Sequence, residues 1–170
     1  MPCAITLRLD AAAAGRIDRI RQAVAARPAD ADYPPHVTLA VLPDEADPEA
    51  AGDAGFREAT GWRAMPVTLA GLGVFPGNPP VVWAVPAVPV ELFEWHRALH
   101  AALSPLSVHP HYRPGSWVPH VTLGQPAATA AIEAALAVWD GPLTALLDRV
   151  ELVRFPPAAV LRSIVLPSGA

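Results

Sequence analysis

Pro35-His36-Val37-Thr38-Leu39 and Pro119-His120-Val121-Thr122-Leu123 are two copies of one five-residue sequence, PHVTL, placed about half the chain apart. Such a repetition in a chain of 170 residues indicates an internal repeat. Each copy follows a turn signal and is mostly β-branched and apolar, which predicts the beginning of a strand. Residues two apart in a strand share a face, so His and Thr point one way while Val and Leu point the other. The repeat therefore predicts two strands that each present an imidazole and a hydroxyl opposite a buried apolar face.

The segments around the two copies follow the same order: strand, helix, copy, helix, strand. This order predicts an α+β fold made of duplicated βαβαβ units, followed by a closing strand. We expect a single domain, residues 1–170, with two pseudo-symmetric lobes, approximately residues 1–76 and 77–170, around a central cleft. The predicted strands are residues 3–9, 36–42, 65–75, 81–85, 120–125, 143–155 and 159–166, and the predicted helices lie within residues 10–26, 44–61, 90–104 and 128–139.

Composition narrows the class of protein. Hydrophobic residues make up 52% of the chain and charged residues 16%, which is typical of a globular protein. A formal net charge of −4 gives no overall attraction for long duplex nucleic acid. All 12 basic residues are Arg, which excludes Schiff-base chemistry on a lysine and a P-loop lysine.

The single cysteine, Cys3, excludes an internal disulfide and a Cys-rich zinc site, and we expect it to be a small apolar residue of the first strand. The chain opens without a signal-peptide pattern and has no apolar run near the ~20 residues that span a bilayer. A cytoplasmic protein without membrane contact is therefore expected.

The paired histidines and threonines suit phosphodiester chemistry. An imidazole with an ordinary pKa of ~6.5 can act as acid or base near neutral pH, and a phosphodiester needs one of each. One imidazole activates the attacking oxygen and the other protonates the leaving oxygen, while Thr38 and Thr122 donate to the phosphate oxygens. This arrangement needs no metal ion and no cofactor.

Two His-x-Thr motifs half a chain apart in a duplicated α/β unit resemble the 2H phosphoesterase superfamily. The length and layout are most similar to its bacterial LigT-like group of 2′-5′ RNA ligases or cyclic phosphodiesterases. The resemblance implies that the protein opens 2′,3′-cyclic phosphate ends of RNA or of small nucleotides, usually to the 2′-phosphate, and that some members join or cleave 2′-5′ linkages. It implies His36 as general acid, His120 as the base that activates water, and Thr38 and Thr122 as phosphate ligands, with acid and base able to exchange in the reverse reaction.

The family often carries an arginine five residues after the second motif histidine, where this chain has Gln125. Gln125 is therefore a candidate substrate-binding residue, and Arg113 or Arg154 is a candidate replacement for the charge. Tyr112 and Trp117, in the Pro-rich loop before the second motif, are candidates for stacking on a base. Tyr33 and Trp83 are weaker candidates, and Trp62, Trp95 and Trp139 are expected to be packing residues.

Four further histidines allow other interpretations. His96 and His100 are spaced i, i+4 on a predicted helix, which fits either two metal ligands or a solvated face, and we favour the solvated face. His109 and His111 form a His-x-His in the long loop, and we favour an ordinary loop over a metal site.

Two alternative functions are therefore compatible with the sequence besides the phosphodiesterase. One is a non-catalytic module that binds a nucleotide or phosphate, and the other is a metal-dependent hydrolase built on these four histidines. We expect a monomer whose partner is an RNA end or a small cyclic nucleotide.

Overall fold

The computed structural model describes residues 1–24, 33–126 and 129–169. These residues form one antiparallel sheet of seven strands and four α-helices. The strands are β1 (Cys3–Leu9), β2 (His36–Leu42), β3 (Met65–Phe75), β4 (Val81–Ala87), β5 (Val121–Gly124), β6 (Leu143–Arg154) and β7 (Ala159–Val165). The helices are α1 (Ala11–Val24), α2 (Pro48–Ala59), α3 (Val90–Ala102), α4 (Thr129–Val138) and a 3₁₀ turn, η1 (Pro110–Tyr112).

Local sequence explains where the first two helices begin. Asp10 precedes α1, and its Oδ1 accepts hydrogen bonds from the backbone N–H groups of Ala12 and Ala13 at 3.0 and 3.1 Å. Asp47 caps α2 in the same way through Glu49 N–H at 2.9 Å, and Pro48 occupies the first helical position. The predicted end of α1 at residues 25–26 lies outside the described residues.

The sheet order is β2-β1-β6-β3-β4-β5, with β7 paired to β6. The long strands β3 and β6 pair with each other over residues 65–69 and 143–147, and then diverge. Beyond that point β6 pairs with β1, and β3 pairs with β4. The order β2-β1-β6 on one side therefore repeats as β5-β4-β3 on the other, which confirms the predicted duplicated α+β fold. Each half of the sheet takes one strand from the other half of the sequence, and the lobe boundary near residue 76 stays a prediction.

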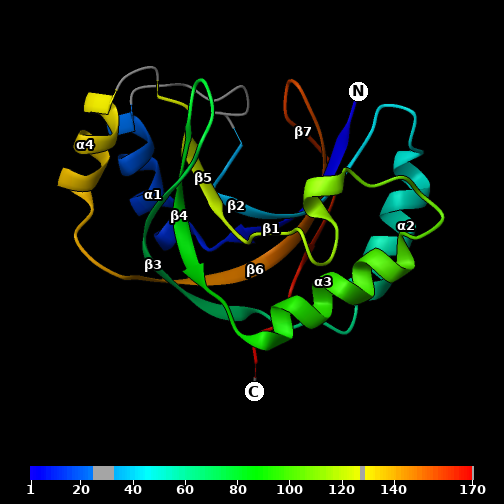
Figure 1. Cartoon of the computed structure of the whole chain (residues 1–170). Helices are drawn as coiled ribbons and strands as arrows, with labels where there is room; N and C mark the ends of the chain where they lie inside the picture. The colour runs from blue at the N-terminus through cyan, green and yellow to red at the C-terminus, as the bar shows by residue number, and fades with distance from the viewer. Residues whose placement is uncertain (25–32, 127–128, 170) are drawn as a thin grey trace.

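The helices follow the same symmetry. Helix α1 contacts α4, and α2 contacts α3. Figure 1 shows these as two separate helix pairs. The sheet curves so that its outer strands β2 and β5 contact each other. No ladder joins these two strands among the described residues, so the sheet is open along this line.

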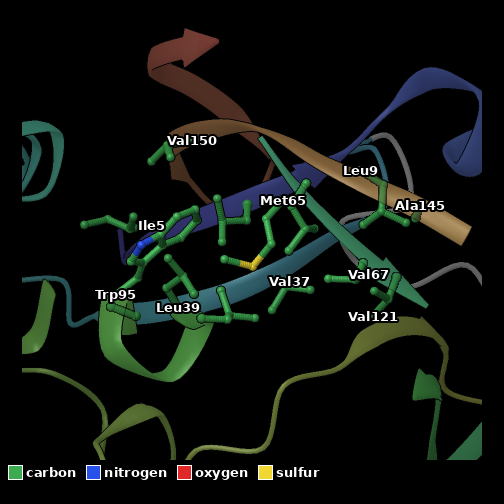
Figure 2. Packing of buried hydrophobic residues seen from close by; sticks show 14 of the residues in the cluster. Ile5, Leu9, Val37, Leu39, Met65, Val67, Trp95, Val121, Ala145 and Val150 are labelled. Carbon is green, nitrogen blue, oxygen red and sulfur yellow. The ribbon is translucent and has the colours of Figure 1, made fainter. Parts of the chain in front are cut away.

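Both PHVTL copies contribute their apolar residues to one core. Val37, Leu39 and Val121 lie among the buried side chains between sheet and helices (Figure 2), and each is 0% exposed. The expected packing role of Trp62 and Trp95 is confirmed, because both are buried and their rings stack with centroids 4.7 Å apart. Trp139 packs against the edge of this core.

Cys3 is a free, buried thiol in β1, as expected. Burial raises the pKa of this thiol, so it behaves as a small apolar residue.

Candidate active site

The two PHVTL copies have matching positions in the structure. His36 is the first residue of β2, and His120 directly precedes β5. The predicted alternation of faces is observed: the four residues of the apolar face are fully buried, and the four polar ones are half-buried. The apolar set is Val37, Leu39, Val121 and Leu123, and the polar set is His36, Thr38, His120 and Thr122.

Each copy also carries a β-bulge at the same residue. In β2, Thr38 and Ala40 pair with adjacent residues of β1, which leaves Leu39 as the extra residue. In β5, Thr122 and Gly124 pair with adjacent residues of β4, which leaves Leu123 as the extra residue. A bulge bends and twists its strand and changes the direction of neighbouring side chains. The two equivalent bulges therefore give the two His-Thr pairs the same local backbone frame.

All four polar side chains line one small cavity. Its volume is about 130 Å³, and His36 and Thr38 from β2 meet His120 and Thr122 from the second copy in its wall. The rest of the lining comes mainly from β1, the end of β6 and the segment before each copy: Ala4, Thr6, Tyr33, Val41, Tyr112, Val153, Phe155 and Ala158. Residues from both halves of the sequence therefore surround a space of the size of a small anion.

Both motif histidines make the same backbone hydrogen bond. The ring Nδ1 of His36 lies 2.8 Å from the carbonyl oxygen of Pro34, and the Nδ1 of His120 lies 2.7 Å from that of Val118. A carbonyl oxygen only accepts, so each Nδ1 carries the hydrogen. The Nε2 atom is then the nitrogen that gains and loses a proton on each ring.

His120 has the more apolar surroundings. The Phe75 ring meets it edge-on at 5.1 Å between centroids, and the Trp83 ring lies 6.0 Å away. Burial lowers the pKa of His120, and the hydrogen bond to the Val118 carbonyl opposes this only in part. The ring is therefore biased toward its neutral form, which can accept a proton at neutral pH.

A buried polar network supports the side of the cavity where His36 lies. The Tyr33 ring contacts the His36 ring at 4.7 Å, and its hydroxyl donates to Glu151 Oε2 at 2.6 Å. Because that single hydrogen is used, the Thr6 hydroxyl donates to the Tyr33 oxygen at 2.8 Å. Glu151 also pairs with Arg8 Nη1 at 3.2 Å. Burial and the neighbouring Glu151 carboxylate raise the pKa of Tyr33, so its hydroxyl stays a donor.

A second, larger cavity adjoins the first and shares Tyr112, His120 and Thr122 with it. Its volume is about 560 Å³, and half of its lining residues carry an aromatic or imidazole ring. The lining residues beyond the shared three are Phe75, Pro76, Val81, His109, His111, Ser116, Trp117, Val118 and Gln125. Tyr112, Trp117 and Gln125, three of the residues singled out in the sequence, therefore do face a cavity beside the two histidines.

The two candidate arginines lie elsewhere. Arg113 is exposed, its Nε donates to the Val108 carbonyl oxygen at 3.0 Å, and it lines neither of these two cavities. Arg154 lines a separate groove beside the start of α2. Neither guanidinium lines the cavity where the two motif histidines meet, and a role for either arginine in substrate binding stays a prediction.

The expectation that His96 and His100 form a solvated face is wrong. His96 is 2% exposed and stacks on Trp117 with ring centroids 3.9 Å apart. Its Nε2 donates to the Tyr112 carbonyl oxygen at 2.8 Å, and the Nε2 of His100 donates to that of Leu39 at 3.1 Å. The reason is that α3 packs this face against the loop before β5 rather than toward water.

His109 and His111 stack on each other at 5.1 Å on the wall of the larger cavity. In the described ranges, no three His, Cys, Asp or Glu side chains are grouped closely enough to form a metal site.

Sequence reasoning missed several residues that hold the site. Thr6 and Glu151 belong to the network described above, and the Arg21 guanidinium donates to the carbonyl oxygens of Tyr33 and Thr122. None of the three lies in the repeat or in a motif of its own. The sequence singles out Tyr33 and Trp117 only as candidates for stacking on a base. The signal for their supporting role is that the repeat extends upstream as an aromatic residue three positions before each motif histidine.

A profile of the 2′-5′ RNA ligase superfamily matches residues 9–156. The chain belongs to the 2′-5′ RNA ligase superfamily. This confirms the resemblance that the paired His-x-Thr motifs indicated, and it supports a phosphoesterase or ligase type of enzyme.

Solved structures agree with the superfamily fold. TT0787 of Thermus thermophilus superposes with a TM-score of 0.71 at 21% identity, over 100% of both chains. E. coli LigT complexed with NADP⁺ superposes with a TM-score of 0.65 at 23% identity, over 98% of this chain and 97% of LigT. LigT complexed with 3′-AMP gives a TM-score of 0.61 at 21% identity, over 98% of each chain. No curated protein sequence matches the chain significantly.

Within the described part of this superfamily member, every helix falls short of the length and apolar character needed to cross a bilayer.

Proposed function

We propose that the protein is a metal-independent phosphodiesterase that opens 2′,3′-cyclic phosphate ends to 2′-phosphates. The observation that carries this proposal is the single cavity into which both His-x-Thr motifs bring their polar side chains. Two imidazoles with fixed Nδ1–H groups and two hydroxyls around an anion-sized space are the groups that phosphodiester hydrolysis needs.

The reaction assigns one role to each side chain. His120 Nε2 takes a proton from water as the water oxygen bonds to phosphorus. His36 Nε2–H gives a proton to the 3′-oxygen as its bond to phosphorus breaks, which leaves the phosphate on the 2′-oxygen. Thr38 and Thr122 donate to the non-bridging oxygens, where charge accumulates. The lowered pKa of His120 supports its role as the base, because the ring is neutral at the start of the cycle.

The larger cavity favours a nucleoside on the substrate. Phe75 and Tyr112 supply aromatic surface beside the catalytic cavity, and Gln125 supplies an amide for hydrogen bonds. E. coli LigT has been crystallised in complex with 3′-AMP and with NADP⁺, which supports a nucleotide as the substrate. The substrate class is therefore an RNA end or a small cyclic nucleotide. If an RNA 5′-hydroxyl attacks phosphorus in place of water, the same groups form a 2′-5′ linkage as the bond to the 3′-oxygen breaks. Acid and base exchange roles in the reverse reaction, which cleaves that linkage.

The test is hydrolysis of a 2′,3′-cyclic mononucleotide, and of a short RNA with a cyclic end, in excess chelator. We expect turnover to a 2′-phosphate at the same rate with and without chelator. Turnover that the chelator abolishes would instead favour a metal-dependent hydrolase. Binding of the nucleotide without turnover of either substrate would favour a non-catalytic module.

A further inference from the structure

Each motif histidine is preceded, three positions earlier, by a buried aromatic residue. Tyr33 precedes His36 and is 5% exposed, while Trp117 precedes His120 and is 8% exposed. Both positions take part in hydrogen bonds that reach the other motif. These contacts matter because no backbone ladder joins β2 to β5 among the described residues.

Trp117 provides the first link. Its indole Nε1–H donates to the carbonyl oxygen of Thr38 at 2.9 Å. The ring itself is held by α3, because it stacks on His96 with planes 4° apart and meets the edge of Phe93 at 5.6 Å. The segment that enters the second motif is thus tied to the threonine of the first.

Arg21 of α1 provides the second link. Its Nη1 donates to the carbonyl oxygen of Tyr33 at 3.1 Å. Its Nε and Nη2 donate to the carbonyl oxygen of Thr122 at 3.2 and 3.1 Å. One planar guanidinium therefore ties the segment that enters the first motif to the threonine of the second.

The two links are pseudo-symmetric and crossed. Each runs from the residue three before one motif histidine to the backbone carbonyl of the threonine in the other motif. One uses the aromatic side chain itself, and the other uses Arg21 as a bridge. Together they replace the ladder hydrogen bonds that a closed sheet would have between β2 and β5.

We propose that Trp117 and Arg21 are positioning residues that set the separation of the two His-x-Thr motifs and so the width of the catalytic cavity. Neither side-chain donor needs to touch the substrate phosphate. Reacting groups must be held within about 0.5 Å of their productive geometry, and a misplacement of about 1 Å costs up to ~10²-fold in rate. The effect on turnover rests on the proposed phosphodiesterase function.

The Trp117→Phe variant isolates the first link, because phenylalanine keeps an aromatic ring beside His96 and removes the N–H donor. We expect a roughly tenfold to hundredfold fall in kcat with little change in KM. Trp95→Phe is the matched control: this α3 tryptophan is also buried, but its ring stacks on Trp62 rather than on His96. It should keep wild-type kcat even if it lowers stability.

The Arg21→Lys variant isolates the second link, because lysine keeps the charge beside Asp18 but lacks the fork that reaches two carbonyl groups. We expect a similar fall in kcat. Arg19→Lys is its control, since Arg19 lies on the same helix and donates to the carbonyl oxygen of Gly15 within it.

A second readout needs no substrate. We expect NMR titration to show a higher His120 pKa in Trp117→Phe and Arg21→Lys than in the wild type, because a wider cavity admits water to the buried ring. If the wild type turns over a cyclic nucleotide, wild-type kcat in both variants would overturn the positioning role. If the wild type is inactive, the phosphodiesterase proposal fails on its own, and unchanged His120 titration in both variants would overturn the positioning role.

Discussion

Thr38 and Thr122 occupy equivalent positions on two strands and line the same cavity. In the proposed mechanism, their hydroxyls donate to the two non-bridging oxygens of the phosphate. Preorganised donors of this kind contribute where charge develops, and the loss of one costs about 10²–10³-fold in rate in well-studied enzymes. The sequence predicted both threonines, because side-chain direction in a strand follows from the period of two.

Replacing either threonine by valine keeps the shape and removes the hydroxyl. We expect Thr38→Val and Thr122→Val each to lower kcat by roughly tenfold or more without a large change in the free energy of unfolding. Steady-state kinetics on a cyclic mononucleotide and urea denaturation measure the two quantities. Thr68→Val, an exposed β3 threonine away from the cavity, is the control. Equal kcat in all three variants would show that the motif hydroxyls do not contact the reacting phosphate.

The residues that support the two motifs could not be predicted from the sequence. Glu151 is 3% exposed and accepts hydrogen bonds from Tyr33, Arg8 and Ser163, which come from distant segments. A buried carboxylate is tolerated only with such partners, but nothing in the sequence shows which distant groups will meet it. The same applies to Arg21, whose role depends on how α1 lies against β5.

At the level of elements, the β3–β4 hairpin forms one wall of the site. Trp83 of β4 lies across Gly73 of β3 and stacks on Phe75 with centroids 4.8 Å apart. A Cβ atom on Gly73 would come within 2.6 Å of the Trp83 ring. The sequence predicted the two strands of this hairpin, at residues 65–75 and 81–85. The structure shows a register shift beside Gly71 and a close side-chain approach at Gly73.

Gly73→Ala should therefore displace the Trp83 ring and, through Phe75, the surroundings of His120. We expect a loss of stability of about 1–3 kcal/mol, in the range of overpacked sites, together with a lower kcat. Gly71→Ala is the matched control, because nothing lies within 4 Å of the added Cβ on the same strand. Chemical denaturation and kinetics of the pair measure both effects. A Gly73→Ala protein that behaves like Gly71→Ala would show that Trp83 moves aside without consequence.

For the molecule as a whole, the buried histidines link stability to pH. Burial, with a smaller contribution from His100, lowers the pKa of His96 to about 4. The unfolded chain therefore binds a proton at His96 between its ordinary pKa of ~6.5 and about pH 4, while the folded protein does not. Stability is fully present above ~6.5 and is lost as pH falls through that window. The lowered pKa values of His100 and His120 act in the same direction.

We expect the free energy of unfolding, measured by urea denaturation, to decrease from about pH 7 to about pH 4.5. The slope should include up to about one proton taken up at His96 on unfolding. His96→Phe keeps a ring against Trp117 and should have a shallower slope, although its stability at neutral pH is lower. Equal slopes in the two proteins would mean that His96 titrates alike when folded and unfolded.

The overall architecture was largely accessible from sequence because a repeated unit dictates a repeated fold. Element order, the duplication and the faces of β2 and β5 all followed from local pattern. The exchange of β3 and β6 between the two halves of the sheet could not be predicted, because strand pairing depends on contacts between segments that are distant in sequence. The burial of His96 and His100 was missed for the same reason: helical spacing shows that two residues share a face but not what covers it.

The central claim is that His36 and His120 act together on one phosphodiester. The measurement that tests it most directly is kcat for a 2′,3′-cyclic mononucleotide in the wild type, His36→Ala, His120→Ala and the double variant. We predict a loss of about 10²–10⁴-fold in each single variant and little further loss in the double variant, because acid and base act as a unit. Wild-type turnover in either single variant would contradict the two-histidine mechanism.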